Sequence, residues 1–101
     1  MKLTFTGLPG KIDYDKSVVV FRIAAPQPAN LPKELPPLAP DDVPPWTVVV
    51  PLAMWSKAKM ADALRLHPTA KLLCEGLPVI KDGHCFLFAT VVKSLWKPEG
   101  A

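Results

Sequence analysis

Trp-Thr-Val-Val-Val at residues 46–50 and Leu-Leu-Cys-Glu-Gly-Leu at residues 72–77 are the two stretches that decide the fold of this chain. Both are rich in the β-branched and apolar residues that strands prefer. Between them, apolar residues recur at helical spacing and predict one helix over about residues 55–66. Strands are also predicted on both sides of this unit. This order of strands around one helix is what a small five-stranded barrel requires.

Two strands are predicted before this unit. Residues 2–6 alternate between apolar and polar side chains, as a half-buried strand does, so that Phe5 faces the core. Residues 17–24 form the second strand. Its Arg22 takes the outer face, and Phe21 beside it therefore points inward.

The last third of the chain is predicted to be a long hairpin, with strands over residues 70–80 and 84–96. Asp82-Gly83 is a strong signal for a two-residue turn, and this turn pairs Ile80 with Cys85. A glycine and a proline within the first of these strands indicate a kink. Extending the register places these residues on one face of the hairpin: Leu72, Cys74, Gly76, Leu87, Ala89 and Val91. It places these on the other face: Glu75, Lys81, His84, Phe86 and Phe88.

Residues 26–45 form a proline-rich connection that contains eight prolines. Neither a helix interior nor a central strand tolerates that density, so the segment is expected to be extended or polyproline-like. Three roles stay open for it. It is a stiffened loop, a docking strip for a protein partner with an aromatic-lined groove, or an arm that wraps a neighbouring subunit.

The composition is that of a single domain over residues 1–101, with half of the residues apolar. The net charge is +3. Residues 26–45 carry one lysine and three carboxylates, which gives −2, so the rest of the chain carries +5. That excess fits a polyanionic partner, and it also fits an ordinary solvated surface. No apolar run is long enough to span a membrane and no signal-peptide pattern is present, which predicts an intracellular protein without membrane contact.

The sequence predicts neither an enzyme nor a cofactor or metal site. Cys74 and Cys85 are expected to be free thiols, because the hairpin register keeps their sulfurs too far apart to bridge. His67 and His84 complete no metal-ligand spacing. No nucleophile is paired with a base, and no glycine-rich phosphate loop occurs.

These motifs together resemble the single-stranded DNA-binding protein family of bacteria and organelles, over about residues 2–96. The resemblance lies in Trp46-x-Val48-Val49, the helix after it, and Leu72-x-Cys74-Glu75-Gly76. The opening Leu-Thr-Phe-Thr-Gly at residues 3–7 also fits the first strand of that family. Within that family, the chain resembles the short, divergent members from cyanobacteria and plastids. The resemblance implies an all-β OB-fold, which is a five-stranded barrel with one helix between strands 3 and 4. It also implies that the protein is located in the cytoplasm or the plastid stroma.

The resemblance also implies a function, which is binding of single-stranded nucleic acid, most simply DNA, by a homo-oligomer such as a dimer or tetramer. Members of the family stack bases on aromatic side chains and neutralise phosphates with basic ones. Trp46 matches the family's tryptophan at the start of the third strand. Val49 is expected to face inward, and residues three positions apart lie on opposite faces of a strand, so Trp46 is predicted to face outward. The further candidates are Trp55, Phe86 and Phe88 for stacking and Arg22, Lys57, Lys59 and Lys81 for phosphates. The alternative is a non-catalytic assembly subunit that has kept the barrel and no longer binds nucleic acid.

Overall fold

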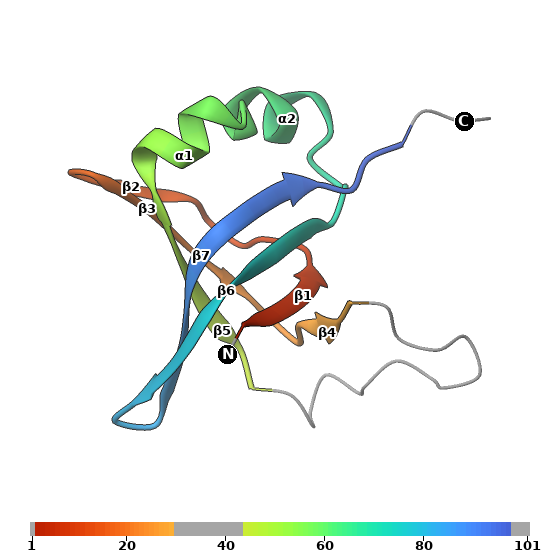
Figure 1. Cartoon of the computed structure of the whole chain (residues 1–101). Helices are drawn as coiled ribbons and strands as arrows, with labels where there is room; N and C mark the ends of the chain where they lie inside the picture. Colours follow the sequence, from red (N-terminus) through yellow and green to blue (C-terminus); the bar gives the residue numbers. More distant parts are fainter. Residues whose placement is uncertain (1, 30–43, 98–101) are drawn as a thin grey trace, which may run out of the picture.

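The computed structural model describes residues 2–29 and 44–97, which form a curved sheet with two short helices at one end (Figure 1). In chain order the elements are β1 (Leu3–Gly7), β2 (Asp13–Asp15), β3 (Val18–Ile23), β4 (Gln27–Pro28), β5 (Trp46–Pro51), α1 (Leu52–Lys57), α2 (Met60–Leu66), β6 (Leu72–Lys81) and β7 (His84–Ser94). The β6–β7 hairpin projects at the end of the sheet opposite the helices (Figure 1). The all-β class expected from the sequence is confirmed at this level.

The sheet has seven strands in the order β2-β3-β5-β7-β6-β1-β4. Neighbours are antiparallel except β5 and β7, which run parallel. A parallel pair needs a crossover, and α1, α2 and β6 supply it between β5 and β7. The closed five-stranded barrel is not confirmed. Among the described residues, the segment after β1 meets β3 through an isolated bridge between Pro9 and Ile23 and a 2.8 Å hydrogen bond from the Gly10 amide to the Arg22 carbonyl, and not through a continuous ladder.

The single expected helix is two helices that begin earlier than the sequence indicated. α1 starts at Leu52, directly after Pro51, so the expectation of a start near residue 55 was wrong. The helical run is interrupted at Ala58 and Lys59, where Lys59 adopts a left-handed conformation with φ 55°. Such a conformation cannot continue a right-handed helix, and the chain therefore restarts as α2.

The core lies on the concave side of the sheet, under the helices. Its fully buried members are Trp55, Phe21, Ile23, Met60, Leu72, Leu87, Val19, Val48, Val50 and Cys74. The inward parity predicted for residues 2–6 and 17–24 is confirmed, since Phe5 and Phe21 are buried. The parity predicted for residues 46–50 was wrong, because the buried residues there are Val48 and Val50 rather than Val49.

The hairpin register near its turn is confirmed: Ile80 pairs with Cys85, and Asp82 and Gly83 both have positive φ. Further from the turn a bulge between Glu75 and Gly76 shifts the pairing by one residue. Consequently Val92 is buried, and Val91, which was expected on the same face as Cys74, is exposed. This register shift lies beside Gly76, where the sequence predicted a kink, but its unpaired residue is Thr90 in β7.

Most of the proline-rich connection lies outside the described residues. Within the described part, Gln27–Pro28 forms β4 at the sheet edge and pairs with Thr6 and Phe5. We expected no strand there; the edge position explains how proline is tolerated. Similarly, the turn expected at residues 14–16 lies at Lys16 and Ser17, and the residues before it form β2.

Candidate nucleic-acid interface

Four of the eight predicted nucleic-acid-binding residues come together on the outer, convex face of the sheet. Arg22 on β3 pairs with Thr47 on β5, and Thr47 pairs with Phe86 on β7. Paired residues in adjacent strands share a face, so an exposed arginine and a half-buried aromatic ring lie in one row across three strands. Val79 on β6 completes this row.

A second, parallel row is more apolar. Val20 on β3 pairs with Val49, Val49 with Phe88, and Phe88 with Leu77 on β6. The phenyl ring of Phe88 is 46% exposed and Leu77 is 50% exposed. Aromatic and aliphatic groups thus cover much of the outer face between β6 and β5, where a solvated sheet face ordinarily carries polar side chains. Lys81 is exposed beside the turn of the hairpin and pairs with His84.

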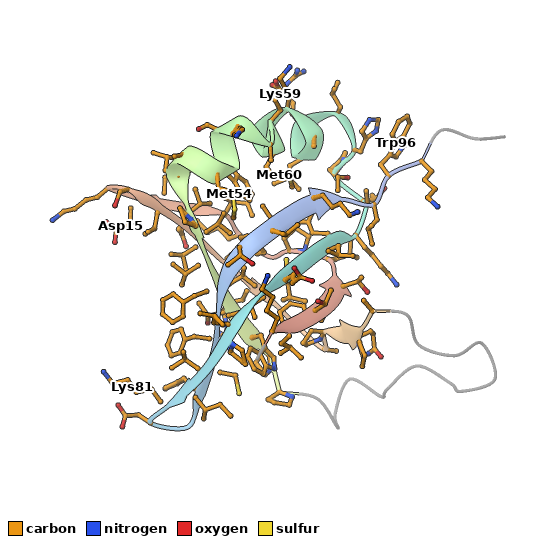
Figure 2. All side chains as sticks on the ribbon, viewed as in Figure 1. Asp15, Met54, Lys59, Met60, Lys81 and Trp96 are labelled. Atoms are coloured by element: carbon orange, nitrogen blue, oxygen red, sulfur yellow. The ribbon has the colours of Figure 1, made fainter. Side chains whose placement is uncertain are left out.

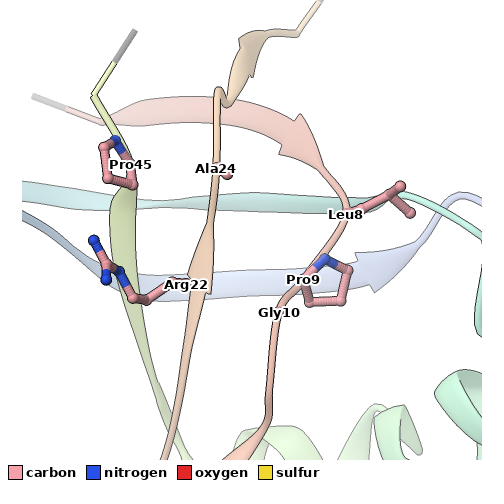
Figure 3. Close-up of a pocket in the computed structure, with 6 residues that line it drawn as sticks. All are labelled: Leu8, Pro9, Gly10, Arg22, Ala24 and Pro45. Atoms are coloured by element: carbon pink, nitrogen blue, oxygen red, sulfur yellow. The ribbon is translucent and has the colours of Figure 1, made fainter. Parts of the chain in front are cut away.

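Arg22 lies between two shallow surface grooves. One groove, of about 390 Å³, is lined by Leu8, Pro9, Gly10, Arg22, Ala24 and Pro45; Figure 3 shows Arg22 and Pro45 on one side of it and Leu8 and Pro9 on the other. The other groove, of about 380 Å³, is lined by Gly10, Lys11, Asp13, Val20, Phe21, Arg22 and Thr47. The guanidinium is therefore accessible from both sides, next to the loop that follows β1.

Charges on this face are mixed. Lys11, in the groove beside Arg22, lies 3.8 Å from the Asp13 carboxylate, and both side chains are largely exposed. An exposed pair of this kind contributes little to stability, and it also leaves less of the lysine's charge for a phosphate. Glu75 accepts a 2.9 Å hydrogen bond from the Thr4 hydroxyl. Arg22 and Lys81 have no ion-pair partner within residues 2–29 and 44–97.

Trp46 lies on the opposite face of the sheet from the one we expected. It shares the parity of buried Val48 and Val50, is half-buried, and packs against the core beside Phe5, with ring centroids 5.8 Å apart. The outward placement rested on an inward Val49, and that premise was wrong. The indole forms the margin of the core near the start of β5.

Trp55 is a core residue rather than a surface stacking platform. Its indole is 1% exposed and packs against Phe21 with ring centroids 5.8 Å apart. The Nε1–H donates a 3.3 Å hydrogen bond to the Tyr14 hydroxyl. The early start of α1 is the reason, because it places Trp55 on the face of the helix that covers the sheet.

Lys57 and Lys59 are exposed, but they do not join the outer-face residues. Both lie where α1 ends and α2 begins. Figure 2 shows Lys59 above the helices and Lys81 beside the hairpin turn, at opposite ends of the molecule. These two helix-end lysines therefore belong to a different surface from Arg22, Phe86 and Phe88.

The cysteines and acidic residues form no reactive site among the described residues. Cys74 and Cys85 are both free. Burial raises the pKa of the Cys74 thiol to about 12, which keeps it protonated near neutral pH and makes it a poor nucleophile or metal ligand. No group of three or more His, Cys, Asp or Glu side chains that could hold a metal ion occurs in residues 2–29 and 44–97.

Comparison with protein-family models, with curated proteins and with solved structures finds no match to this chain. The family resemblance therefore stays a sequence-based hypothesis. Within the described part of the chain, no helix is long and apolar enough to cross a membrane.

Sequence reasoning missed one aromatic cluster altogether. The imidazole of His67 and the indole of Trp96 are stacked, with ring centroids 3.7 Å apart and an interplanar angle of 10°. In the sequence, His67 is notable only as a histidine that completes no metal-ligand spacing, and Trp96 only as the end of the last predicted strand. No local pattern links two residues so far apart in the chain, so only the fold could reveal their contact.

Proposed function

We propose that this chain binds single-stranded nucleic acid across the outer face of β3, β5 and β7. The observation that carries the proposal is the row Arg22, Thr47 and Phe86 on the outer face. In this row a cation without an ion-pair partner among the described residues and an aromatic ring lie on either side of Thr47, and a groove lined by Arg22 and Thr47 adjoins the row. Aromatic rings for stacking beside cations for phosphates are the combination that binds single strands without base-specific contacts.

The order of the five longer strands supports an OB-fold as the framework. Without the short β2 and β4, the order is β3-β5-β7-β6-β1, with β5 and β7 parallel and the helices between β5 and β6. OB-folds bind oligonucleotides on the face of strands 2 and 3 and with the loops that follow strands 1 and 4. In this chain those parts are β3, β5, the loop with Gly10 and Lys11, and the turn at residues 82–83.

The test is a binding titration with fluorescently labelled oligo(dT) at low salt, followed by anisotropy. Phe86→Ala should weaken binding by about 1–3 kcal/mol, because one base can no longer stack. Arg22→Gln should also weaken it, and should lower the slope of log K against log salt by about 0.7, the value expected for removing one phosphate-binding cation. A parallel titration with oligo(U) separates DNA from RNA preference.

Lys57→Gln with Lys59→Gln is the matched control, because it removes two charges at the helical end and leaves the outer face intact. This double variant should retain nearly wild-type affinity. Failure of the wild-type chain to bind oligo(dT) or oligo(U) at low salt would contradict the proposed function. A larger drop in affinity for the control than for Arg22→Gln would move the site to the helices.

A second candidate function is assembly through the same face, and the outward residues of β6 favour it. Glu75, Leu77, Val79 and Lys81 alternate on that face, with an acid at one end, a base at the other and exposed apolar groups between them. A two-fold axis through the middle of this stripe would set Lys81 of one copy against Glu75 of the second, with the apolar groups buried between them.

Charge reversal tests this assembly directly by sedimentation. Glu75→Lys and Lys81→Glu should each weaken the dimer roughly tenfold, because like charges then meet at both ends of the interface. The double variant should restore it, since the pairs are only exchanged. A wild-type monomer at high concentration, or a double variant weaker than both singles, would refute the interface. A dimer that binds no oligonucleotide would favour this function over the first.

A further inference from the structure

The stacked pair of His67 and Trp96 forms a platform beyond the end of β7, away from the outer face described above. Figure 2 shows Trp96 beside the chain that leaves α2, at the opposite end of the sheet from Lys81. The indole remains 48% exposed although one of its faces is covered by the imidazole at 3.7 Å. A ring covered on one face and still half exposed offers its second face to solvent.

Several backbone contacts hold the two rings in place. The Leu95 amide donates to the Lys71 carbonyl at 2.8 Å, which ties the chain before Trp96 to the start of β6. The Trp96 amide donates to the Ser94 hydroxyl at 3.3 Å. On the other side, the His67 amide closes α2 through a 2.9 Å bond to the Ala63 carbonyl. The platform is thus pre-ordered, so less conformational entropy is lost when a planar ligand stacks on it.

Three exposed lysines lie within a few residues of Trp96, along the chain or across the β6–β7 ladder. Lys71 is the residue bonded to Leu95, Lys93 lies on β7 opposite Leu73, and Lys97 follows Trp96 directly. None of the three forms an ion pair within residues 2–29 and 44–97. By contrast, Lys11 in the outer-face groove already lies beside a carboxylate. The Trp96 end of the sheet is therefore the more basic of the two aromatic surfaces.

We propose that Trp96, stacked on His67, is a second contact site for single-stranded nucleic acid. One base stacks on the open face of the indole, and the flanking phosphates are neutralised by Lys71, Lys93 and Lys97. This inference rests on the proposed function, and it adds a site at the other end of the sheet. It also assigns a role to the most exposed of the three tryptophans, whereas Trp46 and Trp55 pack in or against the core.

The experiment uses the full chain and oligo(dT), read by anisotropy and by tryptophan fluorescence. Trp96→Ala should weaken binding about 5- to 150-fold, the effect expected when one base can no longer stack. Trp96→Phe keeps a stacking ring, so its affinity should fall less than that of Trp96→Ala, while the fluorescence quenching on binding should disappear. Leu66→Ala removes an apolar group of similar exposure on α2 and should leave the affinity unchanged.

A variant without the three lysines is compared with the wild type by the salt dependence of binding. This salt dependence would not change if Trp96 had only a structural role. Lys71→Gln, Lys93→Gln and Lys97→Gln together should lower the slope of log K against log salt by roughly 2, at about 0.7 for each phosphate that is no longer neutralised. Thermal unfolding of each variant shows whether the fold is retained. If Trp96→Ala unfolds the chain, the lysine variant and Trp96→Phe decide the matter.

The outcomes separate this site from the outer face. If the wild-type chain binds and only Phe86→Ala and Arg22→Gln weaken it, the Trp96 site is refuted and the proposed function stands. If only the Trp96 and lysine variants weaken it, the Trp96 site stands and the outer face does not carry the function. If the wild-type chain binds neither oligo(dT) nor oligo(U) at low salt, both proposals are wrong.

Discussion

Replacing Trp55 with alanine is expected to lower the free energy of unfolding by about 3–5 kcal/mol, the usual cost of truncating a fully buried large aromatic side chain. Trp55 is the only buried residue of α1, and its ring packs on Phe21 of β3. Its removal would leave a cavity under α1 and take away the main contact that holds this six-residue helix on the sheet. Urea unfolding followed by far-ultraviolet circular dichroism measures the effect without relying on the removed indole.

Tyr14→Phe is the matched control for this substitution, because it removes only the hydroxyl that accepts the Trp55 Nε1–H bond. Tyr14 is 60% exposed, so water can replace much of this hydrogen bond, and the cost should stay below about 1 kcal/mol. If Trp55→Ala unfolds at the wild-type urea concentration and instead weakens oligonucleotide binding, Trp55 is a binding residue, as its sequence context suggested.

Gly76→Ala is the second substitution with a large expected effect, about 3 kcal/mol or more, at the upper end of overpacking costs. A Cβ built on Gly76 would lie 2.1 Å from the Phe88 carbonyl oxygen and 2.7 Å from the Ala89 Cα. Both atoms are backbone of the paired strand, so no side-chain rotation can relieve the clash. The β6–β7 ladder must shift at the bulge, and the buried residues beside it, Cys74 and Leu87, must move with it.

Gly10→Ala controls for the general effect of adding a methyl group to a glycine. Its Cβ would meet only the Arg22 carbonyl oxygen, at 3.4 Å, and the change should shift stability by less than about 1 kcal/mol. Urea unfolding of the two variants side by side makes the comparison. Equal stability of Gly76→Ala and Gly10→Ala would mean that the bulge can open without cost and that the close approach is not required.

The sequence predicts well wherever a local rule determines the geometry. The Asp82-Gly83 turn fixed the pairing of Ile80 with Cys85, because a two-residue turn with two positive φ angles allows only one register beside it. Strict alternation likewise identified the inward faces of residues 2–6 and 17–24. The prediction was wrong by one residue where three valines run together: Val48, Val49 and Val50 have the same hydrophobicity, so parity cannot be read from them.

The candidate site was predicted only in part, because local rules fixed the face of some of its residues and not of others. Arg22, Phe86, Phe88 and Lys81 follow from parity and the hairpin register, and they do share the outer face. Trp55 was misplaced because the helix begins at Leu52, a start that no capping side chain announces.

What the sequence by itself determined is the set of longer strands, the hairpin and the place of the helices between the stretches at residues 46–50 and 72–77, since these depend on contacts between near neighbours. Only the tertiary structure decided which tryptophans are core and which is accessible. Burial of Trp46 and Trp55 depends on Phe5 and Phe21 in strands far away in the chain. The stack of Trp96 on His67 depends on how α2 returns to the end of β7. Such contacts arise from packing between distant segments, which no local pattern encodes.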